Sequence, residues 1–543
     1  MKRQTVLRGA VWLMLSAVLA KLLGAVFRIP LTALLGGAGM GYYSSAYGIF
    51  LPVYALSVSG INTAVAALTA AALAKRNFAE CRGIARAAYR LFGIGGLCGS
   101  AALWALAGPL CRYVLHNPQA ESAVRLFAPA VWFCCMSAVL RGLYEGRQQM
   151  IPTAVSQIAE GIARLCCGLT AAGLVLRSPE QALRFFPAGT SPAAAAAAAA
   201  VLGVTLSTAA GTAVLLIFRR TLRLPAHSPA DPSQHRRIRH ELIALLLPVA
   251  AASLVTNLTT LIDLCTGLRG LTAGILRSPA AYGISPADAQ TDAAALANFC
   301  YGAYAGLAVT VFNLVPSVTN MLGKAVLPAF ADAYVRGDSG EMQRHAAEVL
   351  RRTAFLAVPA GMGIFVLAEP ILQFLFPSRQ AEIQIAAQPL SILGIALIFT
   401  ALSCPVFSMM QASGHAGDAV TAMLYGAGIK LAGNLILIPH MQLRGAALAT
   451  GLSYLTILLG SLYLFRRRTG LPVSLRDACG RACIAGLCCA AAAGFLYRQL
   501  APLPQRTALL LSIAGGGAVY LAVMLPQKKT ARAMPNPTVM HSK

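Results

Sequence analysis

Long apolar segments recur along almost the whole chain, and they limit its possible folds more than any other feature. Runs of roughly 20 residues with few charges are long enough for a helix to cross a bilayer. Hydrophobic residues make up 57% of the sequence and charged residues only 11%. We therefore predict an all-α integral membrane protein with about 14 transmembrane helices. The predicted spans are 5–27, 44–72, 88–107, 122–140, 152–176, 193–218, 242–264, 297–322, 353–376, 384–411, 416–438, 444–465, 479–498 and 506–525.

The distribution of lysine and arginine predicts the orientation of these spans. Short cytoplasmic loops retain positive charge, and with the N-terminus inside roughly 29 of the 44 basic residues fall in cytoplasmic segments. We therefore expect a multi-pass protein of the bacterial plasma membrane with both termini in the cytoplasm. The net charge of +26 then reflects topology and contact with membrane lipids. No nucleic acid is expected as a partner, because no basic soluble domain is visible.

Other basic residues lie inside the predicted spans or within two residues of their ends. Lys21 and Arg28 are seven residues apart, so a helix places them on one face together with Gly24. A charge that faces lipid costs several kcal/mol, and we expect this face to line a wet cavity inside the protein. The candidate substrate-binding cations are Lys21, Arg28, Arg164, Lys324 and Lys430.

Polar and aromatic residues form stripes at helical spacing in the same spans. Glu160 and Arg164 are four residues apart, which predicts an ion pair within one helix. The candidates for the cavity wall are Tyr43, Tyr47, Gln157, Glu160, Asn313, Asn320 and Asn434. The alternative is that such residues only hold helices together, and that the tyrosines are anchors at the membrane interface.

The sign of the embedded charges predicts the class of substrate. The spans contain more cations than carboxylates, of which Glu160 and Asp263 are the two embedded examples. A cationic cavity favours an anion such as a phosphate or pyrophosphate. Tyrosine and asparagine suit the hydroxyl groups of a sugar. A cation-coupled drug exporter should carry acidic residues early in the chain, and span 5–27 has none.

Weak internal similarity predicts a duplicated architecture. The segment that begins at Gly41-Tyr42-Tyr43 resembles the segment from Cys300 to Tyr304, and Gly161-Ile162-Ala163-Arg164-Leu165 resembles Gly428-Ile429-Lys430-Leu431. Repeats in transporters place the binding site between them. We predict an N-lobe at 1–220, a basic cytoplasmic linker at 221–240, a C-lobe at 241–466, two further helices within 467–527 and a cytoplasmic tail at 528–543.

Three segments carry a resemblance to a known family: KLLGAVFRIPLT at 21–32, GMGYYSSAY at 39–47 and SGIN at 59–62. The chain resembles the stage V sporulation protein B group of polysaccharide biosynthesis proteins. That group belongs to the superfamily of multidrug, oligosaccharidyl-lipid and polysaccharide exporters (MOP), which includes multidrug and toxin extrusion (MATE) transporters and the lipid II flippase MurJ.

The resemblance implies two pseudo-symmetric six-helix lobes with a MATE-like arrangement, and two C-terminal helices that form a groove for a lipid tail. It also implies a flippase that exports an undecaprenyl-pyrophosphate-linked saccharide or peptidoglycan precursor by alternating access, in cell-wall, spore-cortex or polysaccharide biosynthesis. The implied partners are this lipid-linked saccharide, membrane lipids and, as candidates, cell-wall synthases. Asp263 matches a position where some relatives hold sodium, so Asp263, Thr256 and Thr260 form a candidate cation site.

The sequence indicates a transporter rather than an enzyme, because it shows no nucleophile–base pair, metal cluster or nucleotide loop. No metal or organic cofactor is expected, and Na+ or H+ are the candidate coupling ions. Two alternatives remain open at this stage. One is a MATE-type cation-coupled multidrug antiporter, and the other is a membrane scaffold for wall or spore synthesis.

Overall fold

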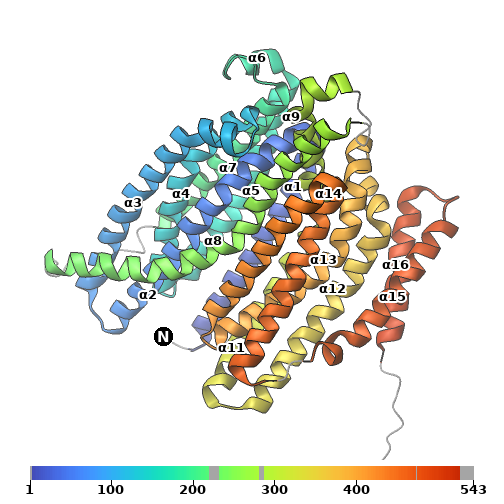
Figure 1. Ribbon diagram of the computed structural model, residues 1–543. Coiled ribbons are helices and arrows are strands. Elements are labelled where there is room, and N and C mark those ends of the chain that lie inside the picture. The colour runs from blue at the N-terminus through green and yellow to red at the C-terminus, as the bar shows by residue number, and fades with distance from the viewer. Residues whose placement is uncertain (1–2, 219–231, 280–285, 472–473, 526–543) are drawn as a thin grey trace, which may run out of the picture.

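The computed structural model describes residues 3–218, 232–279, 286–471 and 474–525, and long helices that run side by side dominate it (Figure 1). Within these residues the chain forms helices, turns and bends but no strands. The prediction of an all-α protein is confirmed.

The elements follow one another as a series of helices with short connections. They are α1 (Arg3–Ala55), η1 (Leu56–Gly60), α2 (Ile61–Ala74), α3 (Phe78–Pro109), η2 (Leu110–Val114), η3 (Pro118–Ala120), α4 (Glu121–Gly146), α5 (Met150–Arg177), α6 (Pro179–Leu183), α7 (Pro192–Ile217), α8 (Pro232–Arg277), α9 (Pro286–Ala303), η6 (Tyr304–Ala308), α10 (Val309–Phe312), α11 (Leu314–Arg336), α12 (Ser339–Leu375), α13 (Gln380–Ala412), α14 (Ala416–Thr469), α15 (Leu475–Gln499) and α16 (Gln505–Met524).

Eleven helical segments in the described residues are long and apolar enough to cross a membrane. The protein is therefore a multi-pass membrane protein. One of these segments is α14, whose 54 residues include a non-helical position at Gln442. This break lies between the predicted spans 416–438 and 444–465. The total of 14 helices and the cytoplasmic position of both termini stay predictions.

The first helix contains a break in the region where the sequence predicted a connection between the spans 5–27 and 44–72. Only Gly36 leaves helical geometry, with φ 63° and ψ −174°. A side chain is disfavoured in this backbone conformation, and the space that a Cβ would need is filled by the Arg379 guanidinium. A tight kink therefore replaces the expected loop.

A second interruption lies between α9 and α11. The helix widens to a π-helix at η6, Tyr304–Ala308, before α10 begins. A π-helical turn shifts the backbone hydrogen bonds and leaves carbonyl groups available to other partners. Two side chains of α1 use these carbonyls, as described below.

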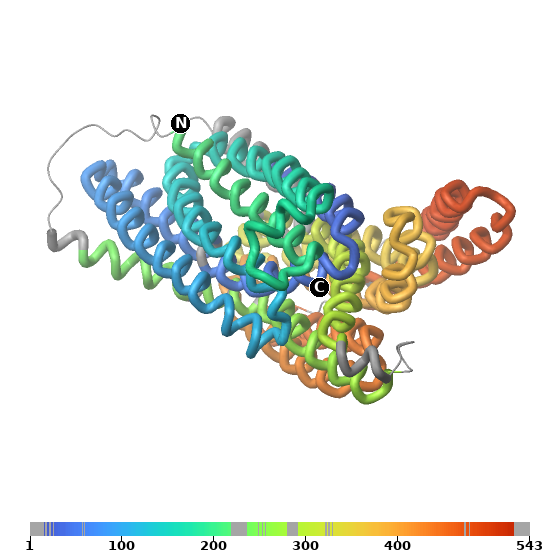
Figure 2. Tube along the Cα trace, turned by 90° about the horizontal axis from the view of Figure 1, so that it is seen from above, coloured from blue at the N-terminus to red at the C-terminus, as the bar shows by residue number. Residues whose placement is uncertain are grey.

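The helices pack as two groups that meet along α1. The first half of the chain packs α1 against α4, α5 and α7, whereas α11 to α14 pack on one another in the second half. Helix α8 contacts both groups, because Ile238 lies beside Gly83 of α3 and Asp263 reaches α14. The hairpin of α15 and α16 lies on the outer side of α12, as both views show (Figures 1 and 2).

The domain limits at 220, 240, 466 and 527 stay predictions. Residues 219–231 and 526–543, which contain the first and last limits, are outside the described residues. Helix α8 begins at Pro232, inside the predicted linker, so the described part of that linker is helical.

Candidate functional site

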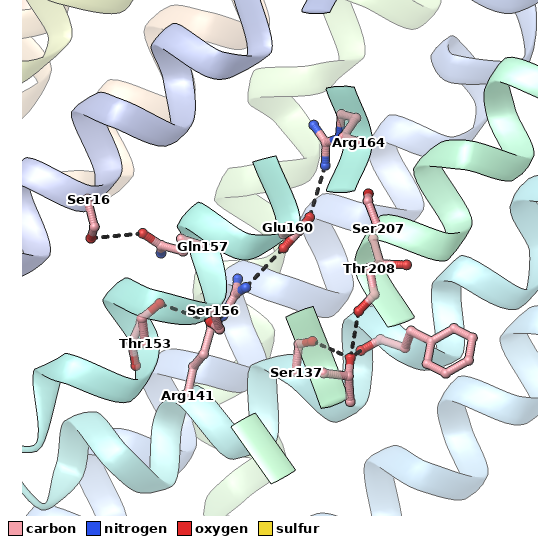
Figure 3. Close-up of polar contacts among 12 residues, drawn as sticks. Ser16, Ser137, Arg141, Thr153, Ser156, Gln157, Glu160, Arg164, Ser207 and Thr208 are labelled. Atoms are coloured by element: carbon pink, nitrogen blue, oxygen red, sulfur yellow. Dashed lines mark hydrogen bonds and ion pairs between the residues drawn. The ribbon is translucent and has the colours of Figure 1, made fainter. Parts of the chain in front are cut away.

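A buried ionic cluster in the first group of helices centres on Glu160 of α5. Its two carboxylate oxygens bind different arginines: Arg141 Nη2 lies 3.0 Å from Oε2 and Arg164 Nη2 lies 2.9 Å from Oε1. Arg141 of α4 also donates from Nε to Ser156 Oγ at 3.2 Å. Figure 3 shows both arginines directed at the one carboxylate from opposite sides. The single carboxylate of Glu160 thus pairs with two guanidinium groups, and Glu145 is a second carboxylate near Arg141.

Polar and aromatic residues connect this cluster to α1. Gln157 Oε1 accepts a hydrogen bond from Ser16 Oγ at 3.3 Å (Figure 3). The rings of Tyr43 and Tyr47 stack with their centroids 6.0 Å apart. Tyr43 is buried and interacts electrostatically with both Arg28 and Arg164. It therefore lies near both the cation of α1 and the cluster on α5.

Arg28 joins α1 to the π-helical turn η6. Its Nη2 donates to the carbonyl oxygen of Ala305 at 3.2 Å, and Thr32 Oγ1, one turn further along α1, lies 3.2 Å from the carbonyl oxygen of Gly306. The Nε of Arg28 is buried and has no hydrogen-bond partner among the described residues. Arg28 thus carries a full positive charge between the two helix groups, and one of its donors is free.

A second ionic cluster connects α8 to α14. Lys430 Nζ lies 2.6 Å from Asp263 Oδ2, and the side chains are 4% and 18% exposed. Asn434 donates from Nδ2 to Asp263 Oδ1 at 3.1 Å and to Thr266 Oγ1 at 2.8 Å. The buried Tyr301 interacts electrostatically with both Asp263 and Arg28. This cluster balances its own charge, and Tyr301 links it to Arg28.

The structure does not bring all predicted site residues together. The side chains of Lys21, Lys324 and Thr256 lie outside the described residues. Asn313 is exposed at the junction of α10 and α11, and Asn320 is half-buried on α11. These positions therefore stay predictions.

The candidate cation site has a partner that the sequence did not indicate. Both oxygens of Asp263 are engaged, one by the ammonium of Lys430 and one by the amide of Asn434. Thr260 is exposed on α8. Among the described residues no group of three or more histidine, cysteine, aspartate or glutamate side chains could hold a metal ion.

The sequence did not predict one member of the first cluster or the contacts that Arg379 and Glu382 make at the Gly36 kink. Arg141 was missed because the predicted span ended at residue 140, although its helix α4 continues to Gly146. At the Gly36 kink, Arg379 donates to the carbonyl oxygens of Ala33 and Leu34 at 2.8 and 3.1 Å. Glu382 Oε1 accepts from the Gly37 N–H at 3.0 Å. The sequence feature that indicates these contacts is the pair of Arg379 and Glu382, three residues apart just before an apolar run.

Two buried tyrosines connect the two clusters and Arg28, and we call these residues together the line of charged groups. Tyr43 lies near Arg164 and Arg28, and Tyr301 lies near Arg28 and near Asp263, the partner of Lys430. Four cations, including Arg141, accompany the carboxylates of Glu160 and Asp263, and Glu145 lies near Arg141, so the group remains positive overall. Guanidinium groups bind phosphate oxygens in a bidentate manner, and buried tyrosines offer ring faces to a sugar. These groups have the chemistry to bind a sugar phosphate.

Comparison with known proteins places the chain among membrane transporters. The model of the family described as "Polysaccharide biosynthesis protein" matches residues 6–334, and the model "Lipid II flippase MurJ" matches residues 294–502. Stage V sporulation protein B of Bacillus subtilis (strain 168) is 23% identical over 84% of this chain and 83% of its own length. Lipid II flippase MurJ of the same organism is 23% identical over 86% of this chain and 83% of its own length.

Solved structures share the fold. A lipid II flippase MurJ in an inward closed conformation superposes with a TM-score of 0.63 at 12% identity, and the match covers 95% of this chain and 98% of that chain. An inward-facing MATE family transporter of the MOP superfamily gives a TM-score of 0.63 at 12% identity, with 83% and 94% covered. The predicted MATE-like and MurJ-like arrangement of helices is thereby confirmed.

Proposed function

Because the chain belongs to the polysaccharide biosynthesis protein family, we propose that it is a flippase for an undecaprenyl-pyrophosphate-linked saccharide or peptidoglycan precursor. The observation that carries this proposal is the excess of positive charge along the line from Arg164 through Arg28 to Lys430. A pyrophosphate is the chemical group that such a charge favours inside a membrane protein.

Each cation has a distinct role in this proposal. Arg28 and Arg164 bind the pyrophosphate, since Arg28 lacks a carboxylate partner in the described residues and Arg164 shares Glu160 with Arg141. Lys430 instead holds Asp263 in a neutral pair, so it acts on the substrate as part of the cavity wall. Lys21 and Lys324 are further proposed contacts. Tyr43 and Tyr47 provide ring faces for the sugar.

Transport follows from alternating access between the proposed N-lobe and C-lobe. The contacts of Arg379 and Glu382 with the α1 kink close one end of the lobe interface. When they open, the substrate site becomes accessible from that end, and a substrate drives the change only by binding one state better than the other. The α15–α16 hairpin is the proposed groove for the lipid tail, with both termini cytoplasmic in a bacterial plasma membrane.

A flipping assay in proteoliposomes tests the proposal. The probe is a fluorescent polyprenyl-pyrophosphate disaccharide, and its transfer between leaflets is followed by accessibility to a quencher. Arg28→Gln and Arg164→Gln should each slow flipping at least tenfold, because each removes a charge-assisted contact with the pyrophosphate. Arg177→Gln, which changes an exposed arginine near the end of the same helix α5, is the matched control and should flip at the wild-type rate. Unchanged flipping in both cavity variants would contradict the proposal.

The two alternatives make different predictions in the same assay. A MATE-type cation-coupled antiporter is favoured by the MATE structural neighbour, and it would move a cationic dye in exchange for Na+ or H+. The Asp263–Lys430 pair argues against a sodium site at Asp263. A membrane scaffold that recruits cell-wall synthases would tolerate both arginine variants, and the wild-type protein would flip neither probe.

A further inference from the structure

A pocket in the second group of helices lies apart from the line of charged groups. Its volume is about 390 Å³, near the lower end of the range of small-molecule sites. Four elements form it: α8, α9, the start of α13, and the break in α14. It is lined by Leu271, Leu296, Phe299, Cys300, Gln384, Ile385, Gln388, Pro389, Gln442, Leu443 and Arg444, none of which belongs to the site described above.

The polar groups of the pocket come from two elements that face each other. Gln384 and Gln388 are four residues apart on α13 and share one face of the helix. Arg444 follows the non-helical Gln442, so the break in α14 brings it to the pocket. Within the described part of the chain, the side chains of Gln384, Gln388 and Arg444 form no hydrogen bond or ion pair. Their donors and acceptors are available to a ligand.

The chemistry of these groups selects a class of ligand. A guanidinium binds a carboxylate in a bidentate manner, and glutamine amides both donate to and accept from hydroxyl groups. The ring of Phe299 and the neighbouring aliphatic side chains offer an apolar surface to the C–H face of a sugar ring. The volume suits one or two sugar rings. We propose that this pocket is a second carbohydrate site, which takes a sugar that bears a carboxylate.

The pocket adjoins the contacts at the Gly36 kink. Phe299 lines the pocket and also contacts Gly37 of α1. Gln384 follows Glu382, the residue that accepts from the Gly37 N–H, on the same helix α13. A sugar bound here holds α9, α13 and the α14 break in the arrangement that supports the kink. Occupancy therefore stabilises the closed end of the lobe interface.

Saturation-transfer NMR on the purified full-length protein in detergent tests this site, with sodium D-glucuronate, D-glucose and sodium acetate as probes. We expect glucuronate to bind the wild type, glucose to bind more weakly, and acetate to compete poorly at equal concentration. Arg444→Gln should raise the glucuronate dissociation constant about tenfold, because it removes a charge-assisted contact at an exposed arginine. Gln388→Ala should weaken both sugars. Arg498→Gln, at an exposed arginine near the end of α15, should bind as the wild type does.

Three results would overturn the proposal: no saturation transfer from any sugar, equal glucuronate binding by wild type and Arg444→Gln, or equally strong competition by acetate. Arg28→Gln separates this site from the proposed function. That variant should lose the lipid-linked substrate and keep glucuronate, so each proposal can fail without the other.

Discussion

The buried pair of Lys430 and Asp263 allows a quantitative test of how charge is balanced inside the bundle. Lys430→Met removes the ammonium and keeps a side chain of similar length, which leaves Asp263 as a buried carboxylate without a counter-charge. Loss of one partner of a buried ion pair costs about 3–5 kcal/mol of unfolding free energy. We expect about 3 kcal/mol here, because Asp263 remains 18% exposed and keeps its hydrogen bond from Asn434. Asp263→Asn should cost more, because the ammonium of Lys430 is only 4% exposed.

The double variant makes the prediction specific. Lys430→Met combined with Asp263→Asn leaves no unpaired charge, and replacement of a buried pair by neutral groups is often neutral or stabilising. The stability of the double variant should therefore lie within about 1 kcal/mol of the wild type. The two substitutions should show a coupling free energy above about 3 kcal/mol in a double-mutant cycle.

Reversible unfolding in mixed detergent micelles, followed by far-ultraviolet circular dichroism, measures each corner of the cycle. The control is the pair of Arg468 and Asp418 from the same helix α14, with 2.7 Å between Nε and Oδ2, in which the basic side chain is 55% exposed. Its cycle should give about 0–1 kcal/mol, as surface ion pairs do. The reasoning is refuted if Lys430→Met costs less than about 1 kcal/mol or if the double variant loses the sum of the two single losses.

Three further variants test other parts of the structure. Glu160→Gln leaves the guanidinium groups of Arg141 and Arg164, whose side chains are 9% and 26% exposed, without their shared counter-charge. It should lower the unfolding free energy by about 3–5 kcal/mol in the same unfolding assay, and a loss below about 1 kcal/mol would show that the arginines do not depend on it. Gly302→Ala places a methyl group against the backbone of α1 at Gly37, and it should lower the unfolding free energy by about 1–3 kcal/mol. The control is Gly363→Ala, where a Cβ meets no neighbour, and equal stability of the two variants would refute the close contact. Arg379→Gln should raise the amide hydrogen exchange rate of Gly37 at least tenfold, because the variant loses the hydrogen bonds from Arg379 to the backbone carbonyls at the kink. Mass spectrometry on peptides of α1 measures this rate, and an unchanged rate would contradict the role of Arg379.

The sequence predicted those parts of the molecule that depend on local pattern. Apolar runs gave the helices, and the four-residue spacing of Glu160 and Arg164 predicted an ion pair that the structure contains. Arg28 bonds to a carbonyl oxygen of another helix, and the wet cavity predicted for its face stays a prediction. Predictions of this kind depend only on the periodicity of a single helix and on the free-energy cost of a charge in lipid.

Features that depend on contacts between distant segments were not predictable. Asp263 and Lys430 are 167 positions apart in sequence, and no local pattern pairs them. The tight kink at Gly36, in place of a longer connection between the first two predicted spans, was also not predictable from a local pattern. The structure shows that Arg379 fills the space beside Gly36, which a sequence does not reveal.

The ammonium of Lys430 affects which ions can bind to Asp263. An ammonium group attached to the chain stays at a high effective concentration beside Asp263, and a diffusing sodium ion must compete with it for the same oxygens. Replacement of sodium by choline in the bathing solution should therefore leave the ion pair and the rate of transport unchanged.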